Sequence, residues 1–195
     1  MPEFAPDSYC AHAQGHPFHG PYHDHEYGFP ERDDARLFER LCLEMNQAGL
    51  SWLTILKKKD NFRAAFDGFD PDVVAGYGEE DRVRLLADAG IIRNRLKVDA
   101  AIHNAGCLLE LRRSHGSFAH WLDAHHLVED ASGERARTKL EWVKLFKKTF
   151  RFTGGEITGE FLLSTGYLPG AHDANCPVHA RIVGLAPPWT RAVER

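Results

Sequence analysis

The feature that most constrains this fold is a pair of helical segments joined by a tight turn, between Leu41 and Lys59. Apolar residues at helical spacing lead to a single carboxylate, Glu44, and Gly49 then breaks the pattern. Ser51 is a favourable N-cap residue for a second helix, which opens with Trp52. The unit therefore brings one acid and one indole to the junction of two helices.

Two interpretations of this junction are open from the residues alone. A flat aromatic ring beside an unpaired carboxylate can hold a flat cationic ligand by stacking and charge. Alternatively, Trp52 packs in the core and Glu44 lies at the surface, as ordinary burial preferences suggest. The first interpretation predicts a binding pocket at the junction, and the second predicts none.

Helical signals continue along the rest of the chain, and the predicted fold class is all-α. Residues 1–30, which are rich in Pro, Gly and His, are predicted to form an irregular arm, and the polar residues 128–137 a loop. Little in the sequence favours strands, and we expect a single domain over residues 1–195. Helices are expected at 33–44, 51–66, 70–77, 79–89, 93–113, 117–126 and 138–149, with a last run at 161–164.

Composition excludes several classes of protein. Apolar residues make up 43% of the chain, enough for a core, yet no apolar run approaches the roughly 18–20 residues that span a bilayer. The N-terminus lacks the basic and apolar regions of a signal peptide, so the four cysteines are expected to be reduced thiols in a cytoplasmic protein. The net charge of −4 argues against a general basic surface for nucleic acid.

Local basic residues nevertheless favour one DNA-binding unit. A helix that stops at Gly90 and a longer one that begins near Arg93 have the order of a helix-hairpin-helix, whose turn amides and second helix face DNA phosphates. The alternative is an ordinary helical hairpin with solvated basic residues, and the spacing leaves both open. In the DNA-binding interpretation, phosphates contact Arg93, Arg95, Lys97 and the run Lys57–Lys59.

Cysteines and histidines near the two chain ends suggest a metal site. Twelve residues separate Cys10 from His23, and three separate His172 from Cys176, so the second pair would share a face on one helical turn. Two thiolates and two imidazoles complete a tetrahedral zinc set and leave no position for water. Solvent-exposed histidines are the alternative to a site, and the nearby substitutes as ligands are His12, His25 and His179.

Three segments carry a resemblance to a known family. They read Tyr-His-Asp-x-Glu-x-Gly at 22–28, Leu-Glu-x-x-Gln-Ala-Gly-Leu-Ser-Trp at 43–52 and Ala-Gly-Ile-Ile-Arg at 89–93. Together with Pro30, they resemble the DNA-3-methyladenine glycosylase I family. The resemblance runs from Cys10 to about residue 105 and returns near the C-terminus.

This resemblance implies an all-helical DNA glycosylase fold with a helix-hairpin-helix. It divides the domain into a hairpin lobe, residues 33–115, and a second lobe, residues 1–32 with 116–195, tied by one structural zinc ion. The expected protein is a monomer that hydrolyses the N-glycosidic bond of 3-methyladenine in double-stranded alkylated DNA, leaving an abasic site for base excision repair. The implied zinc ligands are Cys10, His23, His172 and Cys176.

The family's base-pocket residues fall on Tyr22, Glu44 and Trp52, and Leu50 falls where its loop approaches the gap in the DNA. Methylation at N3 leaves adenine cationic, so the base can depart as a neutral molecule with little acid catalysis. We expect the enzyme to flip the base out of the duplex, stack it on Trp52 and hold it with ionised Glu44. No lysine is expected in this pocket for a covalent Schiff-base step.

The sequence also departs from the family pattern near the expected pocket and zinc site. Three alternatives therefore stand beside 3-methyladenine excision: a divergent member for another alkylated base, a non-catalytic binder of alkylated DNA, and a zinc hydrolase with an open metal position. The departures are His12, His19, Tyr27, Met45, Asn46, the segment 163–166 that begins with Leu163, and the segment 167–172.

Overall fold

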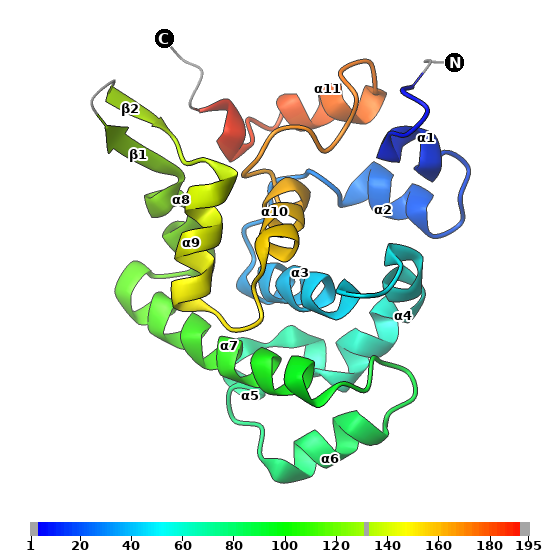
Figure 1. Cartoon of the computed structure of the whole chain (residues 1–195), viewed down its shortest axis with the longest axis vertical. Helices are drawn as coiled ribbons and strands as arrows, with labels where there is room; N and C mark the ends of the chain where they lie inside the picture. The colour runs from blue at the N-terminus through cyan, green and yellow to red at the C-terminus, as the bar shows by residue number, and fades with distance from the viewer. Residues whose placement is uncertain (1–3, 131–132, 192–195) are drawn as a thin grey trace.

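The computed structural model describes residues 4–130 and 133–191, and it is mostly helical (Figure 1). The elements are α1 (Tyr9–Ala13), α2 (His19–His25), α3 (Asp34–Gln47), α4 (Trp52–Ala65), η1 (Asp67–Phe69), α5 (Pro71–Val74), α6 (Glu79–Ala87), α7 (Arg95–His115), α8 (Phe118–His126), β1 (Leu127–Asp130), β2 (Gly133–Ala136), α9 (Lys139–Thr149), α10 (Gly155–Ser164), α11 (Pro177–Val183) and η2 (Pro188–Thr190).

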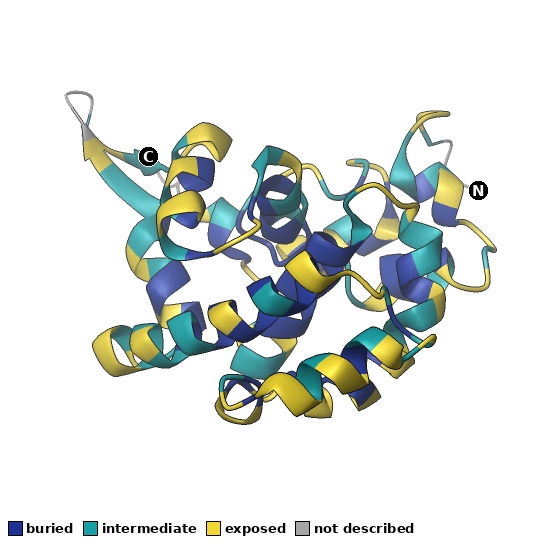
Figure 2. Cartoon of the chain, turned by 60° about the horizontal axis from the view of Figure 1, so that its bottom comes forward, coloured by how far each residue is buried: buried dark blue, intermediate teal, exposed yellow. Residues whose placement is uncertain are grey.

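Helix α3 forms the centre of the fold, with α4, α7, α8 and α10 packed around it (Figure 1). Every residue from Leu37 to Asn46 is buried, so the apolar core surrounds this helix, and burial is densest along the middle of the molecule (Figure 2). A helix buried on all sides usually carries apolar residues alone. Here α3 also buries Glu39, Arg40 and Glu44, and such charges need partners or a function.

Local sequence signals set the junction between α3 and α4. Gly49 has a positive φ of 82°, which glycine adopts without strain, and the chain turns there. The Ser51 hydroxyl accepts a hydrogen bond from the Thr54 N–H at 3.2 Å and caps α4, as predicted. Asp70 and Pro71 begin α5 in the predicted manner.

The N-terminal segment is more regular than predicted. The sequence predicts an irregular arm over residues 1–30, whereas α1 and α2 form there. The prediction is wrong because both helices are short and contain histidine, glycine or proline, which weaken a periodic signal. Ring contacts hold them in the fold, such as Tyr9 against Tyr27 with 5.0 Å between ring centroids.

A β-hairpin corrects the all-α prediction in one place. Strands β1 and β2 pair antiparallel, from Leu127 opposite Ala136 to Asp130 opposite Gly133, and all but Leu127 fall in the predicted loop 128–137. These strands are mostly polar and lack the apolar alternation of a half-buried strand, so the sequence carries no strand signal there. The hairpin lies on the opposite side of the molecule from α2 and α4 (Figure 1).

The N-terminal helices lie against a segment from the C-terminal part of the chain. Helices α1 and α2 lie beside α11 (Figure 1). The Gly28 N–H donates to the Ser164 carbonyl at 3.0 Å, which fastens the segment after α2 to the end of α10. Among residues 4–130 and 133–191, no helix has the length and apolar character needed to cross a membrane.

Candidate active site and metal-ligand cluster

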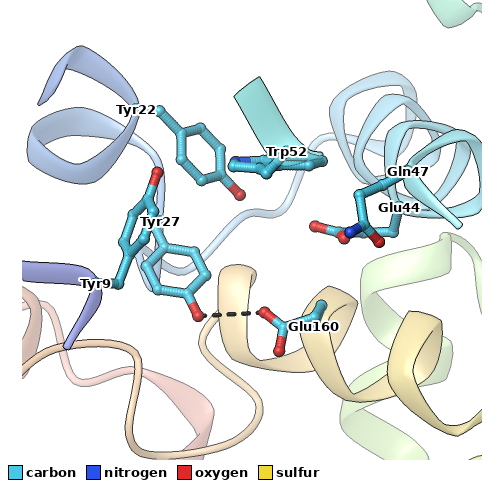
Figure 3. A pocket seen from close by; sticks show the side chains of 7 residues that line it. All are labelled: Tyr9, Tyr22, Tyr27, Glu44, Gln47, Trp52 and Glu160. Carbon is cyan, nitrogen blue, oxygen red and sulfur yellow. Dashed lines mark hydrogen bonds between the residues drawn. The ribbon is translucent and has the colours of Figure 1, made fainter. Parts of the chain in front are cut away.

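A pocket of about 300 Å³ opens at the predicted junction of α3 and α4. Its walls come from α1, α2 and the segment that follows it, α3, α4 and α10 (Figure 3). This volume is at the lower end of the range for small-ligand sites. The lining residues are Tyr9, Tyr22, Tyr27, Glu44, Gln47, Trp52 and Glu160.

Glu44 lies near the end of α3 with 4% of its surface exposed, so the interpretation as a surface residue is wrong. Within the described residues its carboxyl group makes no hydrogen bond or ion pair. Burial raises the pKa of Glu44 to about 8, with Arg40 opposing the rise and Glu160 adding to it. The raised pKa favours the neutral carboxyl group, whereas the expectation of an ionised Glu44 concerns its contact with a cationic base.

Trp52 is the first residue of α4, and its half-buried ring forms one wall of the pocket (Figure 3). The alternative of a core Trp is correct in part, because the ring also packs against the main apolar core. Its ring meets that of Tyr22 at 5.2 Å between centroids and an angle of 60°. The helix start at Ser51 and this aromatic contact together fix the indole orientation.

Tyr22 comes from α2 and is buried at the back of the pocket. Arg40 Nη1 donates a hydrogen bond to the Tyr22 hydroxyl at 2.6 Å, and the guanidinium lies 4.7 Å from the ring centroid. Burial raises the pKa of Tyr22 well above its usual value, so the hydroxyl keeps its proton. Because the oxygen accepts from Arg40, that proton is free to be donated towards a ligand.

The structure adds pocket residues that the motifs do not assign. Gln47 lies three residues after Glu44 on the same helix, a spacing that could have indicated it. Tyr9 precedes a predicted metal ligand, and its hydroxyl bonds to His19 Nδ1 at 2.9 Å. Nothing in the sequence signals Glu160, whose position depends on the packing of α10 against α3.

Most of the departures from the family pattern lie outside this pocket. Met45 packs in the core, and the Asn46 amide donates to the Cys42 carbonyl at 2.8 Å. Leu163 does not line the pocket either. Only Tyr27 does so directly, and His19 acts through Tyr9. Of the departures expected near the pocket, Tyr27 therefore lies in its wall, and His19 contacts a wall residue.

Cys10, His23, His172 and Cys176 form one buried cluster, in which the possible ligand atoms all lie within 4.8 Å of one another. His172 Nδ1 lies 3.0 Å from His23 Nε2 and 3.7 Å from Cys10 Sγ. Cys176 Sγ lies 3.8 Å from His23 Nε2. These separations are similar to those between the corners of a tetrahedron around zinc.

The ring nitrogens of His23 and His172 that face away from the cluster have hydrogen-bond partners, which orient both imidazoles for a metal ion. His23 Nδ1 is 2.7 Å from Asp24 Oδ1, and His172 Nε2 is 2.7 Å from the Tyr27 carbonyl. With protons on those nitrogens, His23 Nε2 and His172 Nδ1 turn their lone pairs towards the two thiols, so the four residues fit a metal. The prediction that His172 and Cys176 share one face of a helical turn is wrong, because His172 precedes α11 and Cys176 is the N-cap of that helix.

The predicted DNA-contacting residues have different surroundings. Leu50 is 39% exposed in the turn between α3 and α4, and Arg93 and Arg95 are exposed around the start of α7. Arg95 lies near two acids, including Asp99 at 3.7 Å. The phosphate contact expected for Lys97 is wrong, because this residue is only 5% exposed.

The buried ammonium group of Lys97 instead supports the turn that carries Leu50. Lys97 Nζ donates to the carbonyls of Asn46 and Ala48, each at 2.8 Å, where α3 ends and its last carbonyls lack helical partners. Two members of the Lys57–Lys59 run are also engaged. Lys58 donates to the Ala89 carbonyl at 2.8 Å, and Lys59 pairs with Glu26.

Solved structures with this fold define the class as helical DNA glycosylases. A variant of 3-methyladenine DNA glycosylase I, determined in complex with 3-methyladenine, has a TM-score of 0.76 to this chain at 34% identity. The match covers 87% of this chain and 96% of that one.

Sequence relatives agree with this class. DNA-3-methyladenine glycosylase 1 of Escherichia coli (strain K12) is 40% identical over 178 residues, covering 86% of this chain and 94% of that protein. DNA-3-methyladenine glycosylase of Haemophilus influenzae (strain ATCC 51907 / DSM 11121 / KW20 / Rd) is 37% identical over 166 residues, covering 80% and 89%. The methyladenine glycosylase family model matches residues 12–179. The chain belongs to this family, which confirms the resemblance seen in the three motifs.

Proposed function

We propose that this protein is a monofunctional DNA-3-methyladenine glycosylase, which hydrolyses the N-glycosidic bond of 3-methyladenine in alkylated DNA and leaves an abasic site. The observation that carries the proposal is the buried carboxyl group of Glu44, which faces an aromatic pocket whose lining contains no cationic side chain. The names of the relatives, and the related structure that holds 3-methyladenine, support this choice of base.

The lesion itself weakens the bond to be broken. A base methylated at N3 is cationic and leaves as a neutral molecule, so the pocket has to extract and orient the base rather than protonate it. Flipping a damaged base out of the stack costs a few kcal/mol. Stacking on Trp52 and contact of the cation with Glu44 would offset that cost, while plain adenine gains only the stacking.

Binding of a cation would ionise Glu44. With a pKa of about 8, ionisation at pH 7 costs roughly 1.4 kcal/mol. A positive charge at about 4 Å returns roughly 4 kcal/mol at an effective dielectric constant near 20. The proton therefore leaves Glu44 as the cationic base enters, and neutral adenine provides no such compensation.

Tyr22 would act as a hydrogen-bond donor to the base. Its hydroxyl oxygen accepts from Arg40, which leaves its own proton for a ring nitrogen of the base. None of the lining residues is a lysine, in keeping with direct attack of water at the sugar carbon without a covalent enzyme intermediate.

We further propose that α6 and α7 act as a helix-hairpin-helix on double-stranded DNA, with the protein working as a monomer. Arg93 and Arg95 would neutralise phosphates near the hairpin, and Leu50 would enter the gap left by the flipped nucleotide. Exposure of all three residues supports these roles.

Zinc is our proposal for the occupant of the four-residue cluster. A closed set of two thiolates and two imidazoles would give a structural ion that ties α1 and α2 to the segment before α11. Asp24 and the Tyr27 carbonyl would hold the two imidazoles in the ligating orientation.

The test incubates the protein with methylated duplex DNA and separates free bases by chromatography, beside a Glu44→Gln variant. The proposal expects 3-methyladenine and alkali-labile abasic sites from the parent, and little release by the variant. A non-catalytic binder would retain DNA without releasing any base. Release of a different alkylated base alone would identify a divergent member of the family.

A further inference from the structure

Glu160 brings a second carboxylate into the pocket from α10. It lies across the pocket from Trp52 (Figure 3). The Tyr27 hydroxyl donates a hydrogen bond to Glu160 Oε2 at 3.3 Å, and over the described part of the chain this is the sole hydrogen bond to that carboxylate. The other oxygen is left for a ligand, so the contact holds the group without saturating it.

Tyr27 is itself fixed from two sides. Its carbonyl is 2.7 Å from His172 Nε2, and its ring contacts Tyr9 at 5.0 Å between centroids. A rigid donor on a half-buried carboxylate defines where that carboxylate points. Tyr27 is therefore a positioning residue for Glu160.

The charges around the pocket do not balance. Its lining holds two carboxyl groups, Glu44 and Glu160, and no lysine or arginine. The nearby Arg40 is already engaged with Tyr22 and Glu26. Lys139 pairs with Glu156 at 3.6 Å and opposes the rise in the pKa of Glu160 without forming an ion pair with it. Burial raises the pKa of Glu160 as it does that of Glu44, as expected for carboxylates without a cation of their own.

We propose that Glu160 is a second substrate-contacting carboxylate, and that Glu44 and Glu160 together select purines that carry a positive charge. This inference rests on the proposed function and adds to it a specificity-determining residue, Glu160. A bound cation would offset the negative charge of the pocket and contact the oxygen of Glu160 that Tyr27 does not. The competing role for Glu160 is structural, fastening α10 to the segment after α2 through Tyr27.

Glu160→Gln tests the proposal because it removes the charge at nearly constant volume. The matched control is Glu156→Gln, one turn earlier on α10, where the side chain is 89% exposed. For release of 3-methyladenine from methylated duplex DNA, kcat/KM should fall about 10- to 100-fold in Glu160→Gln, the range that a hydrogen bond to a charged group contributes. In Glu156→Gln it should stay within about twofold of the parent, as for an exposed ion pair.

A binding measurement separates substrate contact from a structural role. The probes are 3,9-dimethyladenine, a permanent cation with a methyl group in place of the sugar, and neutral 9-methyladenine, titrated against tryptophan fluorescence. Reversible partial unfolding would weaken the apparent affinity for both probes by the same factor, so the ratio of the two dissociation constants reports on the pocket alone. The proposal expects Glu160→Gln to bind the cation about 10- to 100-fold more weakly while 9-methyladenine binding changes little.

Equal weakening for both probes, or an unchanged preference for the cation, would overturn the inference and leave Glu160 a structural role. If the parent protein releases no 3-methyladenine at all, the proposed function fails instead. The cation preference of the parent and the variant would still decide the role of Glu160 in that case.

Discussion

Replacing Glu44 with Gln is expected to lower activity and raise stability at the same time. The carboxyl group is buried without a hydrogen-bond partner in the described part of the chain, and its pKa of about 8 compares with an ordinary 4.5. The fold therefore resists ionisation of this group. Glutamine cannot ionise, so the variant escapes that penalty but loses the charge that binds a cationic base.

The sign and size of the stability effect follow from proton linkage. Because the pKa is raised in the folded protein, the penalty is absent below about pH 4.5 and grows until about pH 8. It is roughly 1 kcal/mol at pH 5, 3 kcal/mol at pH 7 and 4 kcal/mol at pH 8. Burial of the new amide subtracts a pH-independent cost of about 1–3 kcal/mol.

Thermal unfolding of the parent and the Glu44→Gln variant between pH 5 and pH 8 measures this directly. The difference in unfolding free energy should grow by roughly 3 kcal/mol in favour of the variant, or about 6–12 °C in Tm for a chain of this size. The exposed Glu156→Gln variant is the control, and its difference from the parent should stay flat. Parallel curves for Glu44→Gln would refute the view that the fold suppresses ionisation of Glu44.

Three further predictions concern the metal cluster, the DNA surface and the turn. Cys176→Ser should lower the bound zinc and the Tm together, because ligand binding and folding are coupled, and a variant that keeps both would exclude this ligand. Arg93→Ala should weaken DNA binding and reduce the slope of log affinity against log salt by about 0.9, whereas an identical slope would remove it from the phosphate contacts. Lys97→Met should lower the unfolding free energy by about 1–3 kcal/mol for each of the two carbonyls, Asn46 and Ala48, that loses its donor, and should leave the salt slope of DNA binding unchanged. Thermal unfolding and salt titration measure the two quantities, and unchanged stability with a smaller slope would contradict the prediction.

The sequence predicted the helical junction well because its signals are local. Gly49 and Ser51 specify a turn and a cap through their own backbone and side-chain chemistry, and both operate as expected. The pairing of Glu44 with Trp52 follows from that turn. The spacing of these residues left both a binding pocket and an ordinary core arrangement open, and the family resemblance favoured the pocket.

The remaining parts of the site depend on contacts between distant segments. Glu160 reaches the pocket only because α10 packs on α3, and no nearby residue marks it. Lys97 has the sequence context of a solvated basic residue, yet the carbonyls at the end of α3 draw it inside. The hairpin at residues 127–136 was not predicted because its two strands are mostly polar. They lack the alternating apolar residues by which a strand is recognised in a sequence.

The most direct test of this account is a single-turnover assay with excess protein on methylated duplex DNA, in which free bases are quantified over time. The account predicts a first-order release of 3-methyladenine, with the strand left intact until alkali cleaves the abasic sites. Tight binding of the methylated duplex without release of 3-methyladenine would contradict it.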